Sequence, residues 1–294
     1  MSTVNISYTE DKISKNITKT VRNIICVLLC LLSLFPFYML IVNATLTNSE
    51  VITSSIYYPK GGFFNNFKGL QEWCKNAQTI AIGKAMINSL IVTVPTVILQ
   101  VYFASLTAYG VVVFDFKLKK VAWAFIYAIM MIPTQVSIIG FMKLCQMTKL
   151  TGSFIPLIIP AMAAPTTVYF MKQYMESGFS VEIVEAARID GCGEFKIFNK
   201  IALPLLKPAM ATQAIFAFVA SWNNLYTPSL VLSTEKKTMG TLPIFIEMIK
   251  SNDKQRDWGQ IYSGIFVAVM PILIAYLILS KYIVAGVALG GVKE

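Results

Sequence analysis

Six long apolar runs constrain this chain more than any other feature of its sequence. About 20 consecutive apolar residues are enough for a helix to cross the hydrocarbon core of a bilayer. The chain is 56% hydrophobic and only 14% charged, whereas soluble domains carry about 25% charged residues. The sequence therefore predicts an all-α polytopic membrane protein with six transmembrane helices. The runs lie within residues 24–42, 85–114, 121–142, 150–171, 208–234 and 259–280.

The basic residues beside these runs predict their orientation. Lysine and arginine close to the end of a span favour the cytoplasmic side. Four basic residues lie in the polar tail 1–23, and three lysines lie in the short loop 115–120. We therefore expect both termini in the cytoplasm. The expected organisation is an N-terminal tail of residues 1–23, a six-span domain of residues 24–284 and a C-terminal tail of residues 285–294.

Residue types that the sequence lacks exclude several function classes. It contains no histidine, which excludes histidine-based acid–base catalysis and histidine metal sites. Its five cysteines include no CxxC pair, and we expect no metal site. No phosphate-binding loop of the form GxxxxGK(S/T) occurs, so we expect a non-catalytic chain that does not hydrolyse ATP. Lysines that flank the spans explain the net charge of +10, so no nucleic-acid partner is expected.

A polar island of residues 172–207 separates the fourth and fifth runs and is predicted to fold as helix, turn and helix. Ser180 is expected to cap the first helix by accepting a bond from a free backbone N–H. Gly191 is expected to end that helix, because glycine adopts the left-handed conformation readily. One face of the first helix should carry Val184, Ala187 and Arg188.

The second helix of the island is expected to start at Glu194 and to stop at Leu203-Pro204, because proline cannot continue the backbone ladder. Its apolar stripe is predicted to contain Phe195, Phe198 and Ala202. Physical reasoning leaves two readings of the island open. It is either a two-helix knob that needs a covering partner or an amphipathic loop that lies on the lipid headgroups.

A resemblance favours the first reading. The pattern Glu185-Ala186-Ala187, Gly191 and Ile201-x-Leu203-Pro204 resembles the EAA loop of ABC importer permeases. The variant Arg188-Ile189-Asp190-Gly191 is similar to the carbohydrate-uptake branch, in particular to the smaller permease subunit of maltose transporters. Ser221-Trp222-Asn223-Asn224 with Pro228, and the ending from Val284 to Lys293, also resemble that branch. The resemblance covers nearly the whole chain.

This resemblance implies the permease subunit of an ATP-driven importer for a carbohydrate, with an oligosaccharide favoured, in the bacterial plasma membrane. The implied partners are a second homologous permease, an extracytoplasmic sugar-binding protein and a cytoplasmic ATPase dimer, which uses the ATP and magnesium. The loop of about residues 173–207 would couple closure of the ATPase to alternating access. The residues implied in this coupling are Glu185, Ala186, Ala187, Asp190, Gly191, Ile201, Leu203 and Pro204.

Neutral polar and aromatic residues inside the runs are candidates for contact with the solute. Amides and hydroxyls suit the hydroxyls of a sugar, and aromatic faces suit its C–H patches. Amides inside spans also serve as hydrogen bonds between helices, worth roughly 0.6–2 kcal/mol each, and for any single residue we favour that alternative. For the cluster from Trp222 to Tyr226 we favour the solute pathway. The candidates are Asn88, Gln135, Trp222, Asn223, Asn224 and Tyr226.

Three other functions remain open. The chain could be a membrane scaffold or signalling protein that binds partners and moves no solute. The chain could be an importer permease for a solute other than a sugar. It could also be an ion-coupled secondary transporter, but no charged residue lies inside a predicted span. Carriers of that kind commonly place an ionisable side chain at membrane depth, so this absence argues against that alternative.

Overall fold

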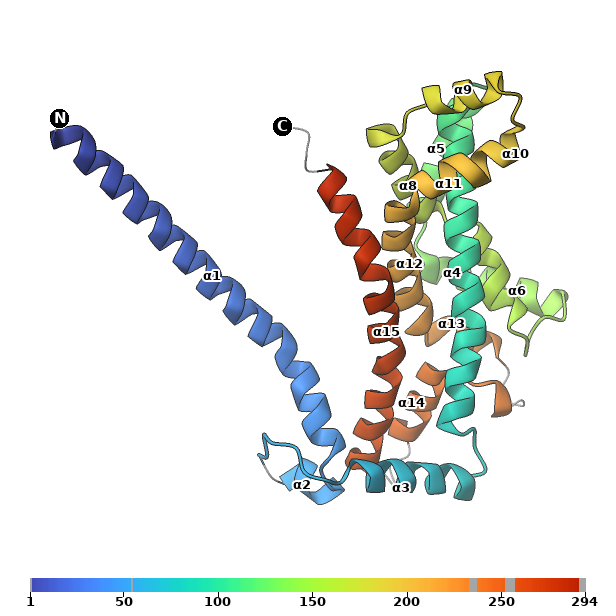
Figure 1. The fold of residues 1–294 in the computed structure, drawn as a ribbon. Coiled ribbons are helices and arrows are strands. Elements are labelled where there is room, and N and C mark those ends of the chain that lie inside the picture. The colour runs from blue at the N-terminus through green and yellow to red at the C-terminus, as the bar shows by residue number, and fades with distance from the viewer. Residues whose placement is uncertain (1, 54, 233–236, 252–256, 291–294) are drawn as a thin grey trace. The chain divides into compact units, whose positions relative to one another are not determined.

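The computed structural model describes residues 2–53, 55–232, 237–251 and 257–290. All regular structure within these ranges is helical, as predicted (Figure 1). Contacts divide the chain into two units. The first comprises Met1–Leu70 with Asp257–Phe266, and the second comprises Gln71–Arg256 with Val267–Glu294.

The first unit begins with α1 (Ser2–Ala44). Its apolar side chains are exposed along most of the described part of the helix, as expected for a helix in contact with lipid. The chain that follows α1 is fixed by Asn66, which lies in α3 (Phe63–Asn76). The side-chain amide of Asn66 donates to the carbonyl oxygens of Ala44 at 2.9 Å and Leu46 at 2.8 Å. The short helix α2 spans Asn48–Thr53.

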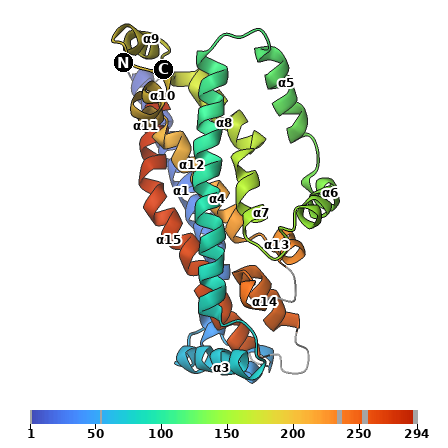
Figure 2. The same ribbon diagram turned by 90° about the vertical axis from the view of Figure 1, so that its right-hand side faces the viewer.

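Helix α4 (Ile82–Val113) is the centre of the second unit. It packs mainly against α8 (Pro165–Gly178) and α12 (Lys207–Trp222) (Figures 1 and 2). Small buried side chains let the helix backbones approach closely, which is how helices pack where lipid supplies no hydrophobic drive. In α4 these buried small residues are Ala85, Ser89, Ala104, Ser105 and Ala108.

The helices α5 (Lys119–Met130) and α6 (Thr134–Met147) lie beyond α8 and α7 (Ile155–Ile158) as seen from α4 (Figure 2). The predicted span 121–142 is therefore not one helix. Pro133 stands between the two helices, where its missing N–H and its ring interrupt the backbone ladder.

The prolines of the fourth run bend it, as predicted. A 3-10 turn, η1 (Ile159–Met162), follows α7 directly. The next two residues leave the helical region, with φ/ψ of −110°/77° at Ala163 and −111°/84° at Ala164. Helix α8 then starts with Pro165, because a proline at the first helical position loses no hydrogen bond.

Four helical segments within the described residues are long and apolar enough to cross a membrane by length and composition. A fifth is counted if two helices joined at an angle of 79°, Glu194–Leu205 and Lys207–Trp222, form one span. The other four are Thr18–Ala44, Ile82–Val113, Ile155–Gly178 and Trp258–Lys281.

The remaining elements follow α12. The fifth predicted span is interrupted at residues 223–225, after which the chain continues as α13 (Tyr226–Val231). Ser89 of α4 accepts a hydrogen bond at 2.8 Å from the backbone N–H of Leu242, the first residue of α14. The last helix extends beyond the predicted sixth span to Gly290. These elements are η3 (Lys237–Met239), α14 (Leu242–Ser251) and α15 (Trp258–Gly290).

Candidate functional site

The polar island folds as two short helical arms joined by a turn, as predicted. Val184 and Ala187 of the first arm are buried and Arg188 lies beside them, which confirms the predicted face. We use the name coupling loop for Glu182–Leu205. Its elements are α9 (Glu182–Ile189), α10 (Glu194–Ile197), the π-helical turn η2 (Phe198–Ala202) and α11 (Leu203–Leu205).

The predicted cap at Ser180 is wrong. The Ser180 hydroxyl donates to the carboxylate of Glu182 at 2.5 Å, and no side chain caps α9, which starts after Val181. A hydrogen bond to an ionised acceptor is stronger than one between neutral groups, so the hydroxyl is used there. The Ser180 hydroxyl lowers the pKa of Glu182.

Gly191 ends α9 as predicted, with φ at +79°. The Gly191 N–H donates to the carbonyl of Arg188 and the Cys192 N–H donates to that of Ala187, each at 3.0 Å. These two bonds form a Schellman motif, which satisfies the last free carbonyls of the helix. No atom lies within 4 Å of where a side chain at Gly191 would begin, so glycine is required by the backbone conformation and not by space.

The predicted apolar stripe of the second arm is confirmed at Phe198 and Ala202 and is wrong at Phe195. Phe195 is 70% exposed, whereas Ile197, Phe198 and Ala202 are almost fully buried. The core of α4 and α8 faces positions 197 and 198, so Phe195 falls on the outer edge. The arm ends at Leu205, one residue after the predicted stop at Leu203-Pro204, as expected for a proline that cannot continue the backbone ladder.

A single apolar cluster fixes the coupling loop to the long helices. Tyr109 of α4 and Met171 of α8 are buried in it together with Phe198. The Phe198 ring lies 5.3 Å from the Tyr109 ring, centroid to centroid. Burying a side chain of this size contributes roughly 1.5–3 kcal/mol. The apolar face of the loop therefore packs on protein and does not rest on headgroups.

A polar link crosses the turn. The Arg188 Nε donates to the Glu194 Oε1 at 2.5 Å, and the Tyr109 hydroxyl donates to the Glu194 Oε2 at 3.3 Å. The Arg188 guanidinium also lies 5.3 Å from the centroid of the Phe114 ring, within the range of a cation–π contact. The bond from Arg188 lowers the pKa of the Glu194 carboxyl. The ion pair thus joins the two arms, and the hydrogen bond from Tyr109 joins them to α4.

The residues implied in coupling fall into two groups. Ala187 is buried, and Ile201 and Leu203 are half-buried and pack against the apolar cluster. The exposed group is Glu185, Ala186, Asp190, Gly191 and Pro204.

The sequence analysis did not predict that two large apolar side chains of the loop are exposed over most of their surface. Ile189 is 87% exposed and Phe195 is 70% exposed. The exposure of Ile189 could have been predicted from the sequence, because this residue lies off the face of α9 that was expected to be apolar. The carboxylates of Glu185 and Asp190 are exposed in the same loop.

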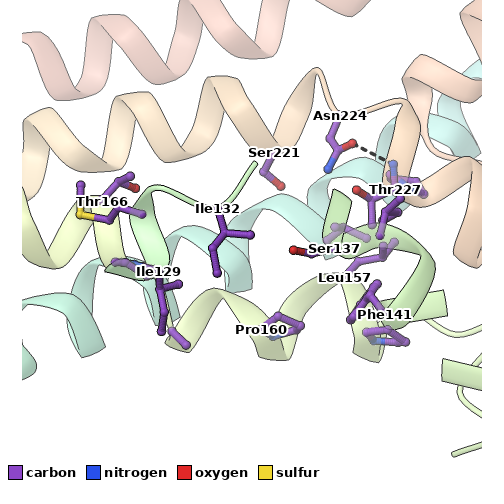
Figure 3. A pocket seen from close by; sticks show the side chains of 17 residues that line it. Ile129, Ile132, Ser137, Phe141, Leu157, Pro160, Thr166, Ser221, Asn224 and Thr227 are labelled. Carbon is purple, nitrogen blue, oxygen red and sulfur yellow. Dashed lines mark hydrogen bonds between the residues drawn. The ribbon is translucent and has the colours of Figure 1, made fainter. Parts of the chain in front are cut away.

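A cavity of about 570 Å³ lies in the second unit between α4, the pair α5 and α6, the α7–α8 segment and α13 (Figure 3). No charged side chain is among its described lining residues. In the view of Figure 3, Ser221 and Asn224 lie along one edge and Ile129, Pro160 and Phe141 along the opposite one. The polar side chains of the lining are Ser137, Thr166, Ser221, Asn224 and Thr227.

Among the predicted solute contacts whose side chains the structure describes, only Asn224 lines this cavity. Trp222 is buried, and its indole N–H donates to the carbonyl of Ala268 in α15 at 3.1 Å. Asn88 is buried and donates to the carbonyls of Thr238 and Gly240, each at 2.9 Å. The polar atoms of these two side chains therefore bond within the chain.

The other candidates lie elsewhere. Asn223 and Tyr226 are exposed and do not line the cavity. The side chain of Gln135 lies outside the described residues. Sequence reasoning did not identify the other four polar lining residues, because serine and threonine are common inside membrane helices and carry no distinctive signal there.

The fold is that of an ABC importer subunit. It matches a chain of a bacterial ABC transporter involved in the import of the acidic polysaccharide alginate, with a TM-score of 0.76 and 20% sequence identity. The match covers 92% of this chain and 97% of that chain. Residues 100–288 match the family described as the binding-protein-dependent transport system inner membrane component. This chain belongs to that family.

Two curated relatives are both permease proteins of transport systems. The chain is 34% identical over 269 residues to the arabinooligosaccharides transport system permease protein AraQ of Bacillus subtilis (strain 168), which covers 90% of this chain and 92% of AraQ. It is 28% identical over 255 residues to the sn-glycerol-3-phosphate transport system permease protein UgpE of Pectobacterium atrosepticum, with coverage of 86% and 90%. The chain is thus a non-catalytic permease subunit of an ABC importer and a multi-pass inner-membrane protein. These matches do not favour the ion-coupled alternative.

Proposed function

We propose that this permease subunit imports an uncharged oligosaccharide. The observation that carries the proposal is the absence of any charged side chain from the described lining of the cavity. An anionic group that leaves water needs a paired charge or several hydrogen-bond donors. The cavity offers neutral hydroxyls and one amide, which suit a neutral sugar better than a glycerol phosphate or an acidic polysaccharide. The similarity to AraQ supports the same cargo class.

The proposed topology has six spans and both termini in the cytoplasm. The six spans are α1, α4, the broken pair α5 and α6, the α7–α8 segment, the pair α12 and α13, and α15. A second, homologous permease completes the pathway, and an extracytoplasmic sugar-binding protein delivers the solute to it. The family resemblance also implies that the tail from Gly290 to Lys293 reaches the ATPase, but residues 291–294 lie outside the described residues.

The coupling loop is the proposed contact with a cytoplasmic ATPase dimer, which binds the ATP and magnesium. Its inner face is fixed to α4 and α8, and its outer face carries exposed Ile189, Phe195, Glu185 and Asp190. A rigid attachment on one face and a free apolar and acidic surface on the other are what transmission of a movement requires. Ala186 and Gly191 keep the outer surface small, so a partner can approach closely.

Uptake into vesicles tests the cargo proposal. The complete transporter, purified through this chain and supplied with its binding protein and ATP, is given neutral arabinooligosaccharides, sn-glycerol 3-phosphate and an oligouronate in parallel. Uptake of a neutral oligosaccharide in preference to both anions is the expected result. Preferential uptake of glycerol 3-phosphate or of the oligouronate would exclude the proposed cargo class while leaving the importer assignment intact.

A further inference from the structure

We infer that the cavity lined by Asn224 and Thr227 is a sugar-contact site, so that this subunit itself selects among neutral solutes. The inference rests on the proposed function and names the residues that carry out the selection. The polar residues that line it are the ones available for contact: Ser137, Thr166, Ser221, Asn224 and Thr227.

Three interruptions of helical structure meet at this cavity. The breaks lie at residues 131–133, 163–164 and 223–225, and each contributes a lining residue, namely Ile132, Ala163 and Asn224. Non-helical backbone at membrane depth is tolerated only where it is buried in protein or lines a water-filled cavity. Discontinuous helices also build the binding sites of other membrane transporters. Three breaks in separate segments around one cavity therefore point to a ligand site rather than to a packing defect.

The cavity lies deep along α4. Val92 of α4 lines it and follows the first residue of that helix, Ile82, by ten positions. At 1.5 Å per residue, this places the site roughly 15 Å along the helix axis. The 32-residue helix is about 48 Å long. The cavity therefore lies along the inner part of this apolar helix and not at either end.

Several polar groups of the lining have hydrogen-bonding capacity that the chain itself does not use. The Asn224 Oδ1 accepts the backbone N–H of Thr227 at 3.2 Å, which fixes the amide at the start of α13 and leaves its Nδ2 to donate elsewhere. The Ser221 hydroxyl donates to the Thr93 hydroxyl at 3.2 Å and retains acceptor capacity. Within the described part of the chain, the hydroxyls of Ser137 and Thr227 form no hydrogen bond of their own and remain available.

The rest of the lining suits the apolar faces of a sugar ring. Phe141, Leu157 and Pro160 present carbon surfaces opposite the polar edge (Figure 3). A volume of about 570 Å³ falls within the range of small-molecule sites, roughly 300–1,000 Å³. The combination of neutral donors and acceptors on one edge with carbon on the other defines a ligand that is uncharged, hydroxylated and amphipathic.

The test compares uptake kinetics of three variants of the complete transporter in vesicles, with arabinotriose and a longer arabinooligosaccharide as probes. Asn224→Asp keeps the acceptor for Thr227 and replaces the free donor by a charged oxygen. Thr227→Val removes one hydroxyl at nearly constant shape. The matched control is Ser229→Ala, which removes a hydroxyl from the same helix, α13, at an exposed position outside the cavity.

We expect Thr227→Val to raise the KM for uptake by about three- to tenfold, the effect of one lost hydrogen bond to the solute, and Asn224→Asp to raise it further. We also expect both variants to change the ratio of kcat/KM between the two probes, which a loss of stability alone would not do. The control Ser229→Ala should match the wild type. Co-purification of the partner subunits with each variant verifies assembly, and Thr227→Val serves alone if Asn224→Asp does not assemble.

The outcomes separate the inference from the proposed function. Wild-type uptake of neutral sugar, with the KM and the probe ratio of both cavity variants equal to those of Ser229→Ala, would overturn the sugar-contact site and leave the proposed cargo intact. Wild-type uptake of anionic solutes alone would overturn the proposed function, and the inference with it.

Discussion

At the scale of single residues, the turn between the two arms of the coupling loop depends on the backbone of Gly191. Its φ of +79° is open to glycine and costs other L-residues about 1–2 kcal/mol. Gly193 provides a natural comparison two positions later. It has a φ of −73°, and at both glycines the space that a Cβ would occupy has no other atom within 4 Å.

We expect Gly191→Ala to lower the stability of the assembled transporter by about 1 kcal/mol and to reduce the solute moved per ATP hydrolysed. Gly193→Ala should leave both quantities near the wild-type values, because its backbone conformation accepts a side chain. Thermal unfolding and coupled uptake of the purified complex check both expectations. Equal effects of the two substitutions would show that the left-handed turn is not the reason for the glycine.

The ion pair between Arg188 and Glu194 belongs to the same scale and gives a dependence on pH. The pKa of Glu194 is lowered in the folded chain, so its ionised form stabilises the fold. This contribution is complete above the carboxyl's unperturbed pKa of about 4.5 and is lost as the pH falls through the lower folded value. The contribution is modest, since the two side chains are 34% and 42% exposed.

We therefore expect Glu194→Gln to be less stable than the wild type at pH 7, with a difference that narrows as the pH falls below about 4.5. Resistance of the coupling loop to limited proteolysis across this pH range measures the difference. A charge-reversed pair, Arg188→Glu with Glu194→Arg, should recover part of the resistance at pH 7. A difference that does not change with pH would contradict the assigned role of the carboxylate.

At the scale of elements, the second arm of the coupling loop has one phenylalanine on each face. Phe198 is 1% exposed and packs on α4, whereas Phe195 is 70% exposed. We expect Phe198→Ala to destabilise the loop by about 3–5 kcal/mol, as truncation of a buried phenylalanine does. Phe195→Ala should change stability by less than about 0.5 kcal/mol, because it removes no buried contact.

The two variants should also differ in their effect on the partner. Phe195→Ala removes exposed apolar surface and is expected to weaken retention of the ATPase during purification while the permease stays folded. Thermal unfolding and the amount of co-purified ATPase measure the two properties separately. Full retention of the ATPase by Phe195→Ala would argue against the outer surface of the loop as the contact.

The features that could be predicted from the sequence are those that single residues impose on the backbone next to them. Gly191 signals the end of α9 through its backbone freedom, and the prolines of the fourth run signal its bend through the missing N–H. The exposure of Phe195 in the second arm was not predictable, because the exact side that is buried depends on where Tyr109 and Met171 lie. The solute cavity was largely missed for the same reason, since its lining comes from segments far apart in the sequence.

Trp222 shows most clearly how far the solute contacts could be predicted from the sequence. An indole beside two amides in a membrane helix suggests a sugar platform, yet its N–H is used by the carbonyl of Ala268. Asn224, two positions later, lies after the end of α12 and lines the cavity. The end of α12 at Trp222 separates these two side chains, and no glycine or proline at positions 222–225 signals that end in the sequence.

At the scale of the whole molecule, the proposed mechanism has one permease subunit whose coupling loop connects an ATPase to a solute pathway. The most direct test is ATP hydrolysis by the complex in lipid vesicles, purified through this chain, with and without its binding protein and neutral oligosaccharides. We predict that an ATPase and a second permease co-purify and that one neutral sugar stimulates hydrolysis together with its uptake. Absence of a co-purifying ATPase, with uptake driven by an imposed proton or sodium gradient, would contradict this mechanism.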